Sequence, residues 1–206
     1  MKRTKLIFPM ILTMLLFFCF AGCKKNSNSP KETEKPSNLL SGQYQVEIEV
    51  ENYGVISLTL DADAAPITVT NFIGLVKDGF YNGLTFHRIM SGFMIQGGDP
   101  EGNGYGGSEN KIKGEFAING YNNPISHTRG TISMARLSKP YDSASSQFFI
   151  MQEDNTGLDG QYAAFGHVTS GMEVVDAICA DVKPIDNNGT VLPIDQPVIK
   201  EIRMVE

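Results

Sequence analysis

The chain is poor in cysteine. It has three cysteines in 206 residues, and two of them, Cys19 and Cys23, lie near the N-terminus. Cys179 stands alone in the rest of the chain, which excludes a disulfide inside the folded domain. Because Cys179 sits on a stretch with apolar residues at helical spacing, we expect it to be a buried core thiol.

Histidine is equally scarce, and His87, His127 and His167 show no spacing typical of a metal site. No Ser-His-Asp set has the sharp nucleophile turn or the oxyanion loop that a hydrolase requires. The glycine-rich string at residues 102–107 is similar to a nucleotide-binding loop, but it opens no apolar helix after a long strand. We therefore expect a surface loop there, no metal site and no cofactor.

Basic residues are outnumbered, since 17 Lys and Arg face 23 Asp and Glu, for a formal charge of −6. Lys2, Arg3 and Lys5 lie in a segment that we expect to be removed, so the mature chain carries −6 − 3 = −9. A net-acidic domain argues against nucleic acid as a partner.

Only one long apolar run is present, at residues 6–20, and it follows a basic start. It is shorter than the roughly 20 residues of a membrane-spanning helix, and with its basic start it predicts a signal peptide at residues 1–22. Ala21-Gly22-Cys23 resembles a bacterial lipobox, with Phe20 where an aliphatic residue is usual. We expect a lipid on Cys23; the alternative is an ordinary secretory signal with an incidental cysteine.

The polar segment at residues 23–42 predicts a flexible linker, because it is rich in Lys, Asn, Ser, Pro and Glu. With a lipid on Cys23, it would tether the domain at residues 43–206 to a membrane, outside the cytoplasm. A domain of this length is large enough for one hydrophobic core.

The domain alternates short strands with glycine-rich loops. Period-two alternation predicts strands at residues 44–50 and 55–60, joined as a hairpin, and apolar runs predict others at residues 131–135, 147–151, 163–168 and 197–205. Residues 85–150 read as strands broken by loops, the longest at residues 97–114. Helical spacing predicts one helix from about Pro66 to Lys77 and another at residues 172–179. Many short strands with two distant helices favour a closed antiparallel barrel over a parallel α/β sheet.

Two separated segments carry the candidate site: residues 85–99, which read TFHRIMSGFMIQGGD, and residues 145–150, which read SSQFFI. The first places Arg88 among apolar neighbours, where a solvated charge would be out of place. Arginine stays protonated and presents a rigid set of donors.

The blocks Phe-His-Arg-Ile, Gly-Phe-Met and Gln-Gly-Gly-Asp, in this order and spacing, resemble the signature of the cyclophilin-type peptidyl-prolyl cis-trans isomerases. The resemblance covers residues 44–206. It implies a mainly β fold, a closed eight-stranded antiparallel β-barrel capped by two α-helices, with the groove on its outer face. It implies that Arg88 is the electrostatic catalyst, since such a donor can weaken the resonance of an X-Pro amide, whose rotation barrier is about 18–20 kcal/mol, by hydrogen-bonding the prolyl nitrogen as it becomes pyramidal. It also implies that Gln96 orients Arg88. The residues that it implies for binding the proline and the flanking peptide are Phe93, Met94, Ala135, Arg136, Gln147, Phe149, Leu158 and Tyr162.

Three positions depart from the family pattern. Arg136 stands where the family often has asparagine, but in the family the main chain at this place binds the substrate. Tyr162 replaces a histidine, as in many bacterial members. Gly157 replaces a tryptophan of many eukaryotic members, and the whole chain contains no tryptophan. Loss of the indole implies weak cyclosporin binding without loss of the isomerase machinery.

The resulting prediction is a monomeric peptidyl-prolyl cis-trans isomerase that acts on proline-containing exported proteins and assists their folding. The alternative is a proline-peptide binding or chaperone module with little turnover in the same groove. Replacement of Arg88 separates the two, because turnover depends on a donor that acts in the transition state, whereas binding would lose only modest affinity.

Overall fold

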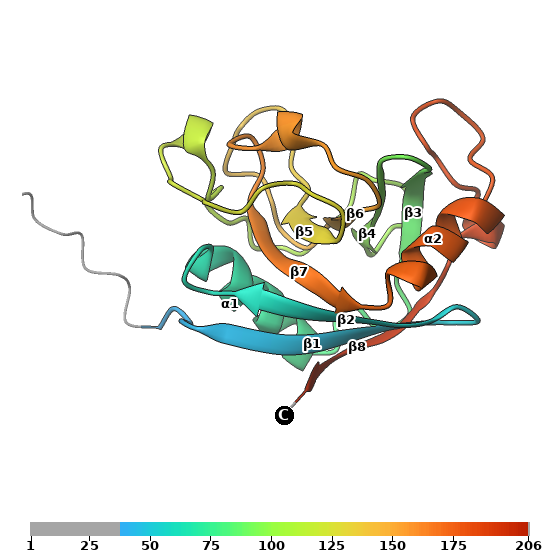
Figure 1. Cartoon of the computed structure of the whole chain (residues 1–206), viewed down its shortest axis with the longest axis horizontal. Helices are drawn as coiled ribbons and strands as arrows, with labels where there is room; N and C mark the ends of the chain where they lie inside the picture. Colours follow the sequence, from blue (N-terminus) through green and yellow to red (C-terminus); the bar gives the residue numbers. More distant parts are fainter. Residues whose placement is uncertain (1–37, 206) are drawn as a thin grey trace, which may run out of the picture. The chain divides into compact units, whose positions relative to one another are not determined.

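The computed structural model describes residues 38–205. The predicted signal peptide, Cys23 and most of the predicted linker lie outside the described residues. Eight strands and two α-helices make up the domain (Figure 1). No helix within the described range has the length and apolar character needed to cross a membrane.

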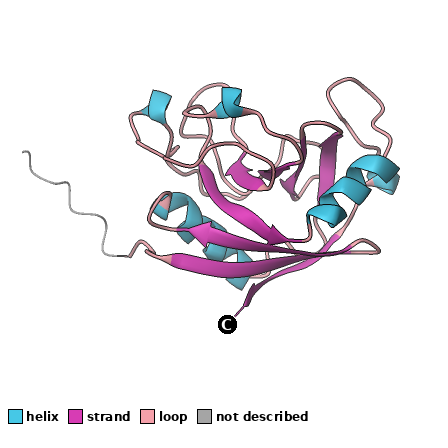
Figure 2. Ribbon diagram, viewed as in Figure 1, coloured by secondary structure: helices cyan, strands magenta, loops and turns pink. Residues whose placement is uncertain are grey.

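The strands, drawn in magenta in Figure 2, form one sheet. Their order is β3-β4-β6-β5-β7-β2-β1-β8, and every pairing between neighbours is antiparallel. The six strands for which the sequence predicted bounds are confirmed to within two residues at each end, and two further strands lie in the segment predicted as strands broken by loops. Their bounds are β1 Gln43–Val50, β2 Gly54–Asp61, β3 Thr85–Met90, β4 Met94–Asp99, β5 Thr131–Met134, β6 Phe148–Met151, β7 Ala164–Ser170 and β8 Ile199–Val205.

The two edge strands of the sheet, β3 and β8, meet over a short stretch. An isolated bridge joins Thr85 to Val198. Beside it, the N–H of Phe86 donates to the carbonyl of Pro197 (3.0 Å), and the N–H of Ile199 donates to the carbonyl of Leu84 (2.7 Å). The eight strands and two helices are confirmed. Strands β3 and β8 pair over a shorter stretch than the predicted closed barrel implies, so the sheet is a curled half-barrel whose edges touch.

The hydrophobic core fills the concave side of this sheet. Val46, Ile48 and Val50 alternate inward along β1 and are at most 2% exposed. Helix α1, Pro66–Lys77, adds Val69 and Phe72 to the same cluster. Full burial of each such side chain contributes about 1.5–3 kcal/mol, which makes the core the main source of stability.

Helix α1 begins at Pro66, as proline at a first-turn position favours. No side chain next to it caps its free N–H groups; the carboxylate of Glu115 does so from a distant loop. Glu115 accepts from the N–H groups of Ile67 (3.0 Å) and Thr68 (2.8 Å), and from the Thr68 hydroxyl (2.7 Å). This fully buried carboxylate therefore fixes the start of α1.

Helix α2, Met172–Asp181, follows Gly171, which has φ of +92° and no room for a Cβ, since the Val55 carbonyl oxygen would lie 2.3 Å away. Cys179 lies on α2 and is buried, as predicted. Burial raises the pKa of its thiol to about 12, so it is unreactive. Three short 3-10 helices were not predicted: η1 Ala117–Asn119, η2 Thr156–Leu158 and η3 Pro193–Asp195.

Candidate active site

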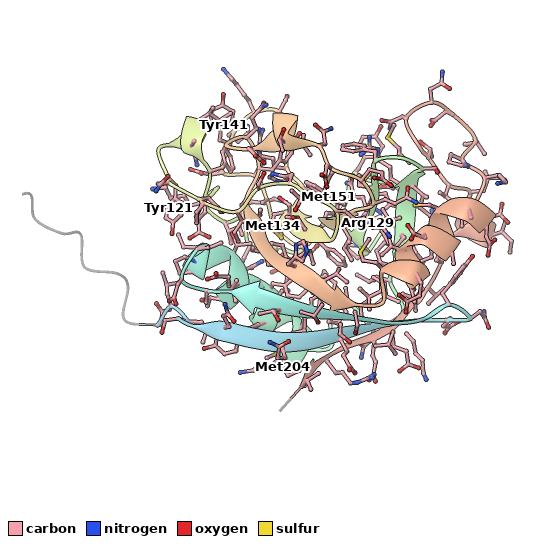
Figure 3. The ribbon with its side chains drawn as sticks, viewed as in Figure 1. Tyr121, Arg129, Met134, Tyr141, Met151 and Met204 are labelled. Atoms are coloured by element: carbon pink, nitrogen blue, oxygen red, sulfur yellow. The ribbon has the colours of Figure 1, made fainter. Side chains whose placement is uncertain are left out.

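The outer face of strands β3 to β6 carries a second, smaller apolar cluster, separate from the core. Met94, Phe149 and Met151 form it, and partly buried apolar side chains pack against it. Figure 3 labels Met151 on β6 and Met134 on the neighbouring β5. Apolar side chains are unexpected on the side of a sheet that faces solvent, so this cluster indicates where the groove lies.

The predicted site residues gather there in one pocket of about 220 Å³. Nine of the ten line it, contributed by β3, β4, β6, η2 and the loops that follow β3, β5 and η2. These nine are Arg88, Phe93, Met94, Gln96, Ala135, Arg136, Phe149, Leu158 and Tyr162. The tenth, Gln147, lines an adjoining pocket that shares Gln96, Ala135 and Arg136 with the first.

Strand register explains why residues so far apart in the chain converge. Arg88 on β3 lies opposite Gln96 on β4, Gln96 lies opposite Phe149 on β6, and Phe149 lies opposite Ser133 on β5. Side chains directly opposite each other across antiparallel strands point to the same face. The sheet therefore aligns the arginine, the glutamine and the aromatic floor in one row.

The Arg88 guanidinium is held at each of its three nitrogens. Nε donates to the backbone carbonyl of Asn188 at 2.7 Å, and Nη1 donates to Gln96 Oε1 at 3.1 Å. Among the described residues, Nη2 contacts only the sulfur of Met90, at 3.0 Å. No carboxylate forms an ion pair with Arg88 within residues 38–205. Burial lowers the pKa of Arg88 from its ordinary value, an effect that Tyr162 and Asp186 oppose, and an arginine remains charged at working pH.

A directed chain of amides fixes the orientation of Gln96. Its Nε2 donates to Gln147 Oε1 at 2.9 Å. Gln147 Nε2 in turn donates to the backbone carbonyls of Gly104 (3.1 Å) and Gly106 (2.8 Å). Because carbonyl oxygens only accept, neither amide can be reversed without losing bonds, and Oε1 of Gln96 must face Arg88.

The floor and walls of the pocket are apolar. Phe149 and Met94 are at most 5% exposed and lie at the base. Tyr162 meets Phe149 edge to face, with ring centroids 5.7 Å apart and planes at 87°, and Leu158 closes the rim from η2. A slot of this size and polarity suits a small apolar ring such as that of proline.

The side chain of Arg136 is occupied inside the protein. Its guanidinium lies 4.6–5.1 Å from the ring centroids of Phe116, Tyr141 and Tyr162, and its Nε donates to the Gln161 carbonyl at 2.8 Å. Tyr141 of this group is labelled in Figure 3. Arg136 therefore braces the Tyr162 wall, and the sequence did not reveal this cation–π cluster.

The main chain beside Arg136 has hydrogen-bonding groups that are unpaired within residues 38–205. The N–H of Ala135 donates to the Gln147 carbonyl at 2.9 Å. The carbonyl of Ala135 and the N–H of Arg136 make no hydrogen bond within the described part of the chain. An extended peptide can pair with such a free edge.

His127 lies behind the floor. It is fully buried, stacks on Phe149 with centroids 6.0 Å apart, and bridges Asp159 (Nδ1 to Oδ1, 2.9 Å) and Ser133 (Nε2 to Oγ, 3.0 Å). Burial lowers the pKa of His127, and the hydrogen bond to Asp159 opposes this. Ser133 is also fully buried, so this row supports the pocket floor.

The other histidines occupy different environments. His87 is 4% exposed, and neither of its ring nitrogens has a partner among the described residues. His167 lies on β7 and is exposed. Within residues 38–205, no group of three or more His, Cys, Asp or Glu is placed to hold a metal ion.

Comparison with known proteins identifies the class. Residues 45–204 match the family model described as cyclophilin type peptidyl-prolyl cis-trans isomerase/CLD. A peptidyl-prolyl cis-trans isomerase of Helicobacter pylori is 47% identical over 129 residues, which cover 62% of this chain and 76% of that protein. Peptidyl-prolyl cis-trans isomerase B of Bacillus subtilis is 46% identical over 124 residues, which cover 60% of this chain and 82% of that protein.

A solved structure agrees with these matches. The crystal structure of a cyclophilin type peptidyl-prolyl cis-trans isomerase of Cryptosporidium parvum, in the presence of the dipeptide Ala-Pro, superimposes with a TM-score of 0.69 and 31% identity. The match covers 79% of this chain and 99% of that one. The chain therefore belongs to the cyclophilin-type peptidyl-prolyl cis-trans isomerases. Its activity is the rotation of peptide bonds that precede proline.

Proposed function

We propose that Arg88, oriented by Gln96, catalyses this rotation in the pocket on the outer face of the sheet. The observation that carries the proposal is the position of the guanidinium, which is held rigidly at the edge of an apolar slot. Within the part of the chain that the structure describes, its Nη2 contacts a sulfur alone and so retains donor capacity for a substrate. A donor that meets the prolyl nitrogen most strongly when it is pyramidal stabilises the transition state more than the ground state.

The remaining site residues divide the substrate between them. Phe93, Met94, Phe149, Leu158 and Tyr162 receive the prolyl ring. The open backbone at Ala135 and Arg136 pairs with the peptide before the proline and holds it while the other side turns. Gln147 contacts the flanking peptide and keeps Gln96 in its orientation.

A peptide titration tests this assignment of residues. We expect a short X-Pro peptide to shift the backbone amide NMR signals of Arg136, Phe149 and Leu158, with changes that saturate together. The matched control is the same peptide with alanine in place of proline, which should leave these signals unmoved. Shifts confined to another face, or equal shifts with both peptides, would overturn the assignment.

We also propose that the enzyme acts outside the cytoplasm, anchored through a lipid on Cys23, on exported proline-containing proteins. The support is the basic start, the apolar run at residues 6–20 and Ala21-Gly22-Cys23. A single lipid-bearing residue is sufficient for anchoring when it carries more than one acyl chain.

Metabolic labelling tests the anchor. Cells expressing the full chain should incorporate labelled palmitate into it and retain it in the membrane fraction. The Cys23→Ala variant should lose the label and leave that fraction, while Cys19→Ala, in the removed segment, should behave as the parent does. Unlabelled parent protein in the soluble fraction would contradict the anchor.

A further inference from the structure

The turn at residues 186–190 docks on the free edge of β3, next to Arg88. The N–H of Ile89 donates to the Gly189 carbonyl at 2.8 Å, and the N–H of Val191 donates to the His87 carbonyl at 3.0 Å. An isolated bridge pairs Arg88 with Thr190. The turn therefore acts as a short extra strand beside the proposed catalytic residue.

Asp186 closes this turn. Its Oδ1 accepts from the N–H of Asn188 at 2.9 Å and from the N–H of Thr190 at 3.0 Å. These bonds are of the kind by which aspartate side chains order local backbone. With its N–H bound to Asp186, Asn188 turns its carbonyl oxygen toward Arg88 Nε, 2.7 Å away.

Gly189 shows how closely the turn fits. Its φ is +85°, and a Cβ there would lie 2.5 Å from the Met90 Cγ and 2.6 Å from the Ile89 carbonyl oxygen. Such separations are too short for nonbonded atoms, so the backbone of the turn contacts β3 directly. A small change in the turn would therefore move the Asn188 carbonyl relative to Arg88.

We propose that Asp186 is a positioning residue for the isomerase reaction, acting through the Asn188 carbonyl on the plane of the Arg88 guanidinium. A planar group held at one atom can still rotate, whereas bonds at Nε and at Nη1 together fix its plane. Gln96 supplies the second bond, and Asp186 secures the first. The negative charge of Asp186 also opposes the lowering of the Arg88 pKa by burial.

This inference rests on the proposed role of Arg88. Three variants of the full chain in detergent distinguish a failure of the positioning role from a failure of the proposed function. Asp186→Ala removes both the acceptor and the charge, Asp186→Asn keeps an acceptor oxygen, and Gly189→Ala displaces the turn without touching Asp186. Asp61 gives a matched control, because its Oδ1 accepts from the N–H groups of Asp63 and Ala64 at 2.9 Å, away from the pocket.

The first readout is the NMR signal of the Arg88 Nε–H group, assigned by its loss in Arg88→Ala. We expect its exchange with solvent to accelerate about tenfold or more in Asp186→Ala and in Gly189→Ala, because the bond to the Asn188 carbonyl is lost. Asp186→Asn should retain most of its protection, and Asp61→Ala all of it.

The second readout is turnover on an X-Pro peptide. We expect kcat to fall about 5- to 30-fold in Asp186→Ala, the factor that corresponds to one or two kcal/mol, with KM changed much less. In an Arg88→Ala background, the same change should have no further effect.

Unchanged kcat in Asp186→Ala and Gly189→Ala, while Arg88→Ala is inactive, would overturn the positioning role and leave the proposed function standing. A fully active Arg88→Ala enzyme would overturn the proposed function itself. A fall in kcat that is equal in Asp61→Ala, or that persists in the Arg88→Ala background, would show a general structural effect and would also overturn the positioning role.

Discussion

Arg88 on β3 and Gln96 on β4 are partners in the sheet register, and Nη1 of the arginine donates to Oε1 of the glutamine at 3.1 Å. The pairing is directional, because Nε2 of Gln96 is committed to Gln147. The sheet thus supplies a fixed guanidinium at the edge of the proline pocket.

Replacing Gln96 tests the amide chain. We expect Gln96→Leu to lower kcat about tenfold, the effect of losing one hydrogen bond to a charged group at the low end of 1.5–3 kcal/mol, because Arg88 gains freedom to turn. KM should change little. Steady-state isomerisation of an X-Pro peptide gives both constants.

Gln45→Leu provides the control for Gln96→Leu. Gln45 is also a strand glutamine whose amide bonds a neighbouring side chain, that of Thr59, at 2.8 Å. It lies on β1, outside the pocket, and its replacement should leave both constants unchanged. If Gln96→Leu retained the parental kcat, the orienting role of Gln96 would be wrong.

The two neighbouring phenylalanines of β6 allow an effect on substrate binding to be distinguished from an effect on stability. Phe149 faces the pocket and Phe148 faces the core. We expect Phe149→Leu to raise KM several-fold, because the prolyl ring loses part of its floor, and to cost less stability than Phe148→Leu, because Phe149 packs in the small pocket cluster and not in the main core.

Phe148→Leu should show the opposite pattern, with unfolding at lower denaturant concentration and an unchanged KM. Its ring meets Phe72 edge to face at 5.6 Å, so its loss disturbs the core. Peptide kinetics and urea unfolding on both variants test the contrast. A raised KM in both would mean that the pocket is not confined to one face.

We expect glycine at position 157 to weaken cyclosporin binding. We predict that Gly157→Trp tightens cyclosporin binding tenfold or more, since burying a large aromatic surface against a ligand is worth at least about 1.4 kcal/mol. The φ of Gly157 is not in the left-handed region, so tryptophan meets no backbone strain there. Calorimetric titration measures the change, with Gly157→Ala as the control. Equal affinity for both variants would contradict this account.

Two buried histidines should make stability depend on pH. Burial lowers the pKa of His87 and of His127 below the ordinary 6.5, which Asp99 opposes in the first case and Asp159 in the second. Below pH 6.5 the unfolded chain therefore binds more protons than the folded one. The contribution of these two histidines to the free energy of unfolding should be fully present above that pH and should decrease as the pH falls through and below it.

Urea unfolding at pH 7.5 and pH 5 in His87→Gln and His167→Gln checks this dependence. The first variant should lose less stability on acidification than the parent, because one depressed pKa is removed. The second alters an exposed histidine and should follow the parent. Parental behaviour of His87→Gln would show that His87 does not contribute.

The sequence was sufficient for the strands and helices because their signals are local. Alternation marked β1 and β2, and apolar spacing marked α1 and α2. Arg88, Gln96 and the pocket residues were found through ordered motifs that resemble a family, since no local pattern joins Arg88 to Phe149. The strand register explains afterwards why these residues meet.

Long-range polar contacts escaped prediction for a physical reason. The Asn188 carbonyl is 100 residues from Arg88, and a backbone acceptor carries no side-chain signature. Glu115 caps α1 from 47 residues away, and Arg136 stacks on rings from three loops. The limited closure between β3 and β8 likewise depends on one short bridge and a few backbone hydrogen bonds beside it, which alternation does not encode.

The most direct test of the central claim compares the parent domain, lacking residues 1–34, with Arg88→Ala and Arg88→Lys on one X-Pro peptide. We predict fast isomerisation by the parent. The rate should fall about 10- to 100-fold or more in Arg88→Ala, because a charged hydrogen bond worth about 1.5–3 kcal/mol is lost. Arg88→Lys should remain impaired, because lysine cannot hold the fixed planar geometry. Isomerisation by a folded Arg88→Ala domain at the parental rate would contradict the account.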